Sequence, residues 1–221
     1  DGFIKSQECP GTCDKSRSSV TASGIIPPMD TRPDPVPAIA PPGDLAIWFF
    51  ILAELLAFGV FFGAYAFGRA HNVALFNEMQ QHLDRQAGAV NTVLLITGSW
   101  CVARAVEAVE RSRAATGARW LAAGILCGGG FLVVKGFEYA DKFSAGINLS
   151  TNTFYMFYLS LTFFHFMHVI LGLVILAALW WKTRQGAYGP GNMNGIESGA
   201  AYWHMVDLVW IVLFPLVYVM H

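Results

Sequence analysis

The last apolar stretch of the chain contains the run Tyr202-Trp203-His204-Met205-Val206-Asp207-Leu208-Val209-Trp210. A histidine and an aspartate lie three residues apart in this run, among side chains that otherwise suit a lipid environment. Ionisable groups inside a bilayer are costly, so they usually face protein, lipid headgroups or a water-filled path. The run therefore predicts a membrane-spanning helix with polar groups that need such surroundings.

The composition of the whole chain supports a membrane location. Of its 221 residues, 55% are hydrophobic and 13% are charged, whereas soluble domains have about 25% charged residues. The net charge is −1, and the basic residues are scattered without interleaved aromatic residues. This pattern excludes a nucleic-acid partner and predicts a polytopic membrane protein.

The chain has five apolar stretches long enough to cross a bilayer. About 20 helical residues span the hydrocarbon core, whereas the strands of a membrane barrel alternate in polarity over about ten residues. The stretches are continuous, so we predict an all-α fold in which each helix satisfies its own backbone. The five predicted spans are Leu45–Phe67, Val90–Val109, Trp120–Tyr139, Phe154–Trp181 and Ala200–Met220.

Two domains are predicted. Residues 1–43 are polar and then Pro-rich, a composition typical of a flexible tail without a core. Residues 44–221 form the membrane domain, which begins at Asp44 as a helix N-cap. Since no apolar segment precedes the tail, the first span is expected to act as the insertion signal.

The distribution of Lys and Arg predicts the orientation. Basic residues precede the first span and lie between spans two and three and between spans four and five, and fewer lie on the other side. Cytoplasmic loops are enriched in Lys and Arg. We therefore place the N-terminus in the cytoplasm and His221 in the periplasm.

Two further local patterns predict structure. Phe76, Met79 and Leu83 are spaced as on a helix, with polar residues between them, so we expect a short amphipathic helix on the outer surface. Gly59 and Gly63 form a small-xxx-small pair that permits close approach of another helix.

Glu54 and the pair Lys135 and Glu138 are the charged groups that most need an explanation. Glu54 either bonds to a neighbouring helix as a neutral carboxyl group or belongs to a proton or gas path. Lys135 and Glu138 are three residues apart near the outer end of their helix, so they share one face. They either pair with each other near the interface or contact a partner subunit or a lipid headgroup.

The helical histidines allow two interpretations. His165 and His168 share a face and could bind a metal or haem, but hydrogen-bonded packing histidines are the simpler interpretation. His204 and Asp207 also share a face, and Glu197 lies one heptad earlier. An imidazole held by a carboxylate occurs in proton relays and also neutralises buried polarity.

No complete catalytic motif is present. The sequence lacks C-x-x-C-H and H-E-x-x-H, the motifs of attached haem and of zinc proteases. Its six histidines, scattered over spans and loops, cannot supply a binuclear haem–copper centre together with its haem ligands. Cys9 and Cys13 form C-x-x-x-C in the tail, where we do not expect a metal site. We therefore predict no catalytic residue, no cofactor and no metal bound by the chain itself.

Four blocks of sequence resemble subunit III of the haem–copper oxidases, and the resemblance covers 43–221. The blocks are Phe50–Leu55 with Phe61–Tyr65, then Lys135–Tyr139, Thr162–Gly172 and Glu197–Trp210. The resemblance implies a bundle with a lipid-filled cleft between its helices. It also implies structural, partner-binding, lipid-binding or proton-linked roles for the residues that match the family's polar positions, which are Glu54, Lys135, Glu138, His165, His168, Glu197, Trp203, His204 and Asp207.

Within that family, the first block, the following Asn91–Leu95 and the ending Tyr202–Pro215 look most like the NorE-type group. That group is associated with the cytochrome c-dependent nitric oxide reductase. The resemblance implies a non-catalytic accessory subunit in a bacterial inner membrane. Its partners would be a catalytic haem-containing membrane subunit and bound phospholipid. The complex would reduce nitric oxide to nitrous oxide in denitrification, and the subunit would support assembly, stability or sustained turnover.

Two alternatives remain open at this point. The chain could be subunit III of an oxygen-reducing cytochrome c or quinol oxidase. It could also be a stand-alone haem- or metal-binding membrane enzyme that uses His165, His168 and His204.

Overall fold

The computed structural model describes residues 44–220. The predicted tail 1–43, with Cys9 and Cys13, and the predicted periplasmic end at His221 lie outside the described residues. The described part is helical and contains no strand, and five of its helices are long and apolar enough to cross a membrane. This confirms the predicted all-α class with five spans.

The membrane-spanning helices extend beyond the predicted apolar stretches. In chain order, the elements are α1 Leu45–His71, α2 Val73–Gln81, α3 Arg85–Glu110, α4 Ala114–Ser144, α5 Thr153–Arg184, α6 Asn194–Phe214 and the π-helix η1 Pro215–Val219. Both α4 and α5 continue into the polar residues that flank the predicted apolar stretches. This is possible because the backbone hydrogen bonds of a helix do not depend on side-chain polarity.

Side-chain caps start three of the spans. The carboxylate of Asp44 accepts a hydrogen bond from the backbone N–H of Ala46 at 3.2 Å, as predicted. Asp84 accepts from the N–H of Gln86 at 2.9 Å and so caps α3. Asn152 caps α5 in the same way. Each cap satisfies backbone donors that have no partner within the helix.

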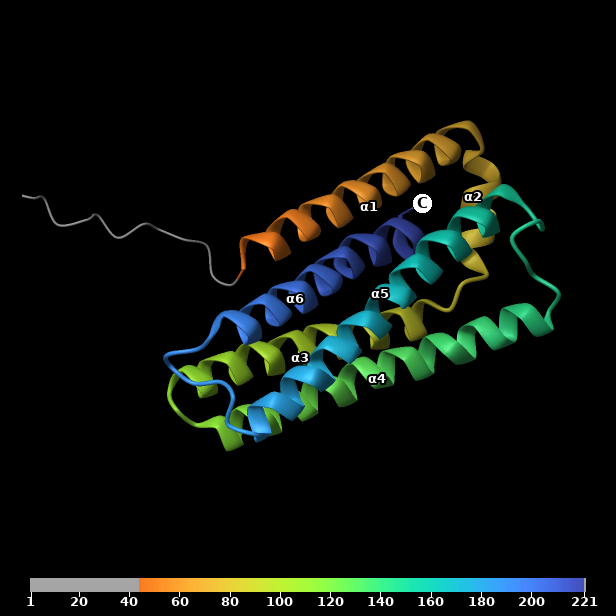
Figure 1. The fold of residues 1–221 in the computed structure, drawn as a ribbon. Coiled ribbons are helices and arrows are strands. Elements are labelled where there is room, and N and C mark those ends of the chain that lie inside the picture. Colours follow the sequence, from red (N-terminus) through yellow and green to blue (C-terminus); the bar gives the residue numbers. More distant parts are fainter. Residues whose placement is uncertain (1–43, 221) are drawn as a thin grey trace, which may run out of the picture. The chain divides into compact units, whose positions relative to one another are not determined.

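The five long helices run side by side, and α6 lies among α1, α3 and α5 (Figure 1). Of the 18 most apolar consecutive residues in each span, 56% are buried in the span formed by α6 and η1, but only 11% are buried in α1. The core of the bundle therefore surrounds α6, and α1 covers one side of it. The last turns of this span are a π-helix that begins at Pro215, where the missing proline N–H cannot continue the α-helical ladder.

The predicted amphipathic helix exists, but it packs against the bundle instead of lying only on the outer surface. Phe76 of α2 is fully buried, and so is Gln80. The Gln80 amide donates to the backbone oxygen of Val217 at 2.9 Å and to the hydroxyl of Tyr65 at 3.2 Å. The helix therefore holds the C-terminal π-helix in place.

The predicted close approach at Gly59 and Gly63 is absent from the described chain. A Cβ atom built at either glycine would have no neighbour within 4 Å. The close approach occurs instead between α3 and α4, where a Cβ at Gly124 would lie 3.4 Å from the carbonyl oxygen of Gly98. A small-xxx-small spacing permits close packing, but it does not show which helix has a partner.

Candidate functional site

The inner face of α5 carries a continuous row of buried polar side chains. Tyr158, Thr162, His165 and His168 follow one another at spacings of three or four residues, and all four are buried. Residues at this spacing share one helix face. The row meets polar groups from α1, α4 and η1, so it organises most of the predicted site.

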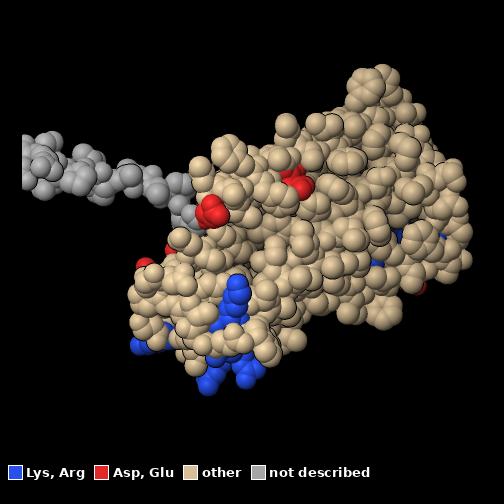
Figure 2. Space-filling view, viewed as in Figure 1, with Lys and Arg blue, Asp and Glu red and all other residues tan. Residues whose placement is uncertain are grey.

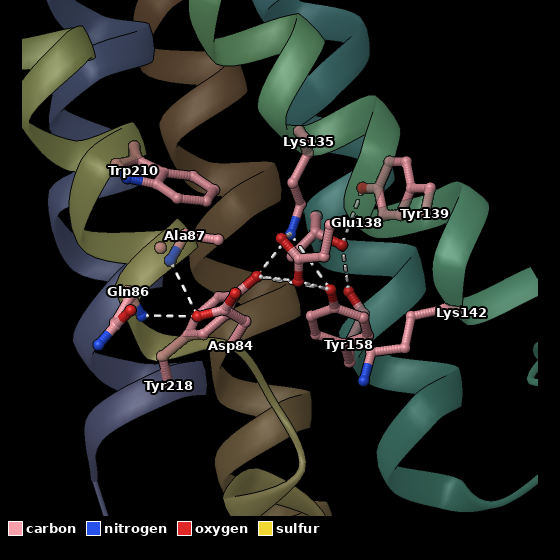
Figure 3. Close-up of polar contacts among 12 residues, drawn as sticks. Asp84, Gln86, Ala87, Lys135, Glu138, Tyr139, Lys142, Tyr158, Trp210 and Tyr218 are labelled. Atoms are coloured by element: carbon pink, nitrogen blue, oxygen red, sulfur yellow. Dashed lines mark hydrogen bonds and ion pairs between the residues drawn. The ribbon is translucent and has the colours of Figure 1, made fainter. Parts of the chain in front are cut away.

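Lys135 on α4 lies at the centre of a cluster of four polar residues. Its Nζ atom lies 3.0 Å from a carboxylate oxygen of Glu138. It also donates to the hydroxyl groups of Tyr158 at 3.2 Å and Tyr218 at 2.5 Å. Figure 3 shows these side chains converging between the helices. The cluster therefore joins α4, α5 and η1.

The carboxylate of Glu138 is satisfied from the same side chains. The Tyr218 hydroxyl donates to Glu138 Oε1 at 2.8 Å, and the Tyr158 hydroxyl donates to the same oxygen. The side chain of Lys135 is 0% exposed and that of Glu138 is 6% exposed. A buried ion pair is tolerated when further hydrogen bonds satisfy both groups, and here the two tyrosines supply them.

The predicted pairing of Lys135 with Glu138 is confirmed. The pair lies inside the bundle, with the ammonium group 5.0 Å from the ring centre of Tyr158 and 5.8 Å from that of Trp210. Aromatic faces attract a cation when water is excluded. Lys135 is therefore not available to a lipid headgroup.

Glu54 on α1 bonds to His168 on α5. The carboxylate Oε2 lies 2.9 Å from the imidazole Nε2, and the other ring nitrogen lies 2.8 Å from the backbone oxygen of Phe164. A carbonyl oxygen can only accept, so Nδ1 carries a proton. Nε2 then either accepts the proton of a neutral carboxyl group or donates to a carboxylate as imidazolium. The predicted bond of Glu54 to a neighbouring helix is confirmed.

His165 contradicts the prediction of a hydrogen-bonded histidine. It is 0% exposed, and neither ring nitrogen has a hydrogen-bond partner among the described residues. Its ring lies between those of Phe131, at 5.7 Å, and Trp210, at 5.2 Å between centroids. Aromatic faces accept weak hydrogen bonds from N–H groups, so this surrounding suits a histidine that packs as an aromatic ring.

His204 and Asp207 do not form the predicted imidazole–carboxylate pair. The Nδ1 atom of His204 lies 2.5 Å from the hydroxyl oxygen of Ser99 on α3. The Ser99 side chain also interacts with Asp207, whose Oδ1 atom is buried without a hydrogen-bond partner in the described part of the chain. A serine from another helix therefore lies between the two predicted partners.

Glu197 does reach the same side of α6 as His204. Both line a groove of about 550 Å³ bounded by residues of α1, α3 and α6, including Ile51 and Val106. Most of the lining is apolar, and Glu197 and His204 are its two ionisable residues.

Trp203 occupies a slot that glycines open in two neighbouring helices. A Cβ added to Gly128 of α4 would lie 2.5 Å from the Trp203 ring, and one added to Gly172 of α5 would lie 2.9 Å from it. The indole is fully buried, and its N–H has no partner among the described residues. Trp203, which belongs to the block Glu197–Trp210, therefore fixes the spacing of α4, α5 and α6.

The histidines of the described residues do not gather around one centre. His168 bonds to Glu54, His204 to Ser99, and His165 lies among aromatic rings. Within residues 44–220, no three His, Cys, Asp or Glu side chains lie close enough to hold a metal ion.

Sequence reasoning missed four residues that complete these contacts. Tyr158 lies on the same helix face as His165 and His168, so the periodicity of polar groups in this span could have identified it. No sequence signal identifies the others, because they come from distant parts of the chain. They are Tyr218 on η1, Gln80 on α2 and Ser99 on α3.

Comparison with known proteins gives the family. The sequence model described as cytochrome c oxidase subunit III matches residues 41–221. The chain belongs to the cytochrome c oxidase subunit III family. The match covers all five spans, so it applies to the whole described bundle.

Individual relatives agree with this assignment. The chain is 34% identical to cytochrome c oxidase subunit 3 of Synechocystis sp. over 77% of its own length and 72% of the relative. It is 30% identical to the corresponding protein of Thermostichus vulcanus, over 80% and 86%. It is also 31% identical to a haem–copper oxidase subunit I+III of Aeropyrum pernix, over 78% of this chain but 22% of that protein.

Proposed function

We propose that the chain is the accessory subunit III of an oxygen-reducing haem–copper oxidase. The match of residues 41–221 to the subunit III family carries the proposal. The relatives given above are named as oxidase subunits, so the comparisons favour this alternative over the nitric oxide reductase interpretation of the sequence. In this role the chain supports assembly, stability or sustained turnover and is not catalytic by itself.

The contacts of the predicted site residues support an accessory role. Glu54, Lys135 and Glu138 are engaged by side chains of other helices. Buried polar groups that are fully bonded specify how helices pack. We propose that these groups hold the bundle in the shape that a partner subunit recognises.

The partner in this proposal is a catalytic haem-containing membrane subunit. One relative is named as a subunit I+III, which is consistent with the two modules functioning side by side. We further propose a bacterial inner membrane with the N-terminus in the cytoplasm, as the distribution of basic residues predicts. The bound phospholipid that the resemblance implies would lie in the groove that Glu197 and His204 share.

A nitric oxide reductase partner is the second candidate. It is favoured by three stretches that resemble the NorE-type group. These are the block Phe50–Leu55 with Phe61–Tyr65, then Asn91–Leu95 and the ending Tyr202–Pro215. The two candidates share every structural feature described above, so the chemistry of the partner must separate them.

Isolation of the intact complex tests the proposal. The full chain, carrying an affinity tag, would be extracted from its native membrane in mild detergent, and its companions analysed by mass spectrometry, optical spectroscopy and metal content. A haem partner that contains copper supports the oxidase, whereas haem with non-haem iron and no copper supports the reductase. A chain that is coloured or metal-loaded when separated from every companion would overturn the accessory role.

A further inference from the structure

Ser99 on α3 connects two polar residues of α6 that form no hydrogen bond with each other in the described chain. Its hydroxyl oxygen lies 2.5 Å from Nδ1 of His204, and its side chain also interacts with the carboxyl group of Asp207. A serine hydroxyl donates one hydrogen bond and can accept others. Ser99 can therefore receive a proton from one of these neighbours while it gives its own proton to the other.

The two ends of this three-residue chain lie in different surroundings. Asp207 is 7% exposed, and its Oδ1 atom is buried without a hydrogen-bond partner among residues 44–220. His204, by contrast, lines the groove of about 550 Å³ between α1, α3 and α6. Its Nε2 atom is not buried and bonds to no described residue. Protons in the groove can therefore reach Nε2 directly, and the contacts of Ser99 lead from this imidazole to Asp207.

No charged group of the described chain pairs with His204 or Asp207. Neither residue takes part in an ion pair within residues 44–220. In the groove, α1 and α3 contribute no ionisable side chain, and Glu197 of α6 is the other ionisable residue of the lining. Ionisable groups that interact closely titrate as a unit, so the protonation of Asp207 depends on that of His204 through Ser99.

The groove connects His204 with one end of the bundle. Glu197 lies in the first turn of α6, and His204 follows seven residues later, which is about 10 Å along the helix. The α6 helix begins at the end of the bundle where Lys and Arg gather (Figures 1 and 2). By the positive-inside rule this end faces the cytoplasm, so the groove gives His204 access from the cytoplasmic side of the membrane.

Trp203 places a free hydrogen-bond donor beside the buried end of the chain. It precedes Asp207 by one turn of α6, so the two residues share a face. A Cβ atom built at Gly98, the neighbour of Ser99, would lie 3.6 Å from Cζ2 of the indole, which is on the same edge of the ring as Nε1. The Nε1–H group is buried without a partner among the described residues. It therefore lies on the side of α6 that faces α3, where it can serve an Asp207 carboxylate that has lost its proton.

We propose that His204, Ser99 and Asp207 form a proton relay between the groove and the interior of the bundle. In the uptake direction a proton binds to Nε2 of His204, the proton on Nδ1 moves to the hydroxyl oxygen of Ser99, and the hydroxyl proton moves to the carboxylate of Asp207. His204 is then neutral with its proton on Nε2, Ser99 is again a hydroxyl group, and Asp207 is a neutral carboxyl group. One proton is taken up and no electron is transferred. The relay does not depend on the identity of the partner subunit.

Hydrogen–deuterium exchange at Asp207, followed by infrared spectroscopy of the full chain in detergent, tests the proposal. The C=O stretching band of a protonated carboxyl group shifts when deuterium replaces its proton, and the Asp207 band is identified by its loss in Asp207→Asn. After transfer into D₂O, we expect the shift to be about 100-fold slower in Ser99→Ala, because a positioned proton-transfer group contributes about 100-fold or more. His204→Gln should slow it similarly, since the amide can bond to Ser99 but cannot pass on a proton.

Two control variants separate proton transfer from packing. Ser99→Thr keeps the hydroxyl group and should exchange at the wild-type rate. Ser160→Ala removes a hydroxyl group from α5, outside the relay, and should also leave the rate unchanged. Thermal unfolding of each variant verifies that the bundle is intact. If Ser99→Ala does not fold, His204→Gln still tests the relay, because it leaves Ser99 in place.

The direction of the effect distinguishes a relay from a structural contact. A bundle that is merely loosened admits water and exchanges faster, whereas a broken relay exchanges more slowly. Wild-type or faster exchange in Ser99→Ala and His204→Gln would overturn the proposal. So would equal slowing in Ser160→Ala, or the absence of an Asp207 carboxyl band at every pH at which the chain is folded.

Discussion

The Nε2 atom of His168 lies 2.9 Å from the Oε2 atom of Glu54, and this contact ties the least buried span to the longest one. Glu54 is the only acidic residue of α1, and its side chain is 20% exposed. The rest of α1 holds to the bundle mainly through apolar contacts, which compete poorly with lipid for helix association. The bond therefore has a large share in fixing where α1 lies.

Removing the carboxyl group should loosen α1. We expect Glu54→Leu to lower the free energy of unfolding in detergent by about 1–3 kcal/mol, because the Nε2 atom of His168 loses its partner. Glu54→Gln should cost less, since an amide can still bond to the imidazole. Unfolding of the full chain by denaturant titration measures both changes.

Leu56→Ala is the matched control for this prediction, because it truncates a side chain on the same helix that is 71% exposed. A loss of stability in Glu54→Leu no larger than in this control would show that the bond does not hold α1.

The buried ion pair of Lys135 and Glu138 predicts how strongly the stability of the bundle depends on each charge. Lys135→Met leaves the carboxylate of Glu138 inside the bundle without its cation, and removing one partner of a buried pair costs about 3–5 kcal/mol. The double variant Lys135→Met/Glu138→Leu should recover part of that loss, because neither charge remains. A double-mutant cycle from unfolding curves measures the coupling. A double variant less stable than Lys135→Met alone would contradict this account of the cluster.

The slot around Trp203 predicts opposite effects at neighbouring glycines. Gly128→Ala places a Cβ atom 2.5 Å from the indole, and overpacking of this kind costs about 1–3 kcal/mol. Gly129→Ala meets nothing within 4 Å, so it should be neutral or slightly stabilising through helix propensity. Thermal unfolding and tryptophan fluorescence compare the two. Equal stability of both variants would show that the slot adapts easily.

The membrane spans could be predicted from the sequence because their apolar length is a local property. The pairing of Lys135 with Glu138 could also be predicted, because two residues that are three positions apart on a helix share one face. Glu54 was correctly expected to bond to another helix, although the sequence did not indicate which one.

The remaining contacts depend on how helices distant in sequence are placed. Ser99 separates His204 from Asp207, and Tyr218 reaches Lys135 from 83 residues away. The aromatic surrounding of His165 is of the same kind, because its rings come from α1, α4 and α6. Periodicity along one helix cannot reveal partners of this kind. It also cannot show that Gly59 and Gly63 face away from the bundle.

Gln80 provides the last prediction, because it connects the short helix α2 to the C-terminal π-helix. Its amide donates to the backbone oxygen of Val217 at 2.9 Å, one of the acceptors at the end of the span, which cannot all find partners within it. Gln80→Leu leaves this buried oxygen unpaired at a cost of about 1–3 kcal/mol. We expect faster amide hydrogen exchange across 215–220, whereas exchange in α3 and α4 should stay unchanged. Gln81→Leu is the control, since the neighbouring glutamine is exposed. If exchange at the C-terminal segment is equally fast in the two variants, the change reflects added bulk in α2 and not the lost hydrogen bond.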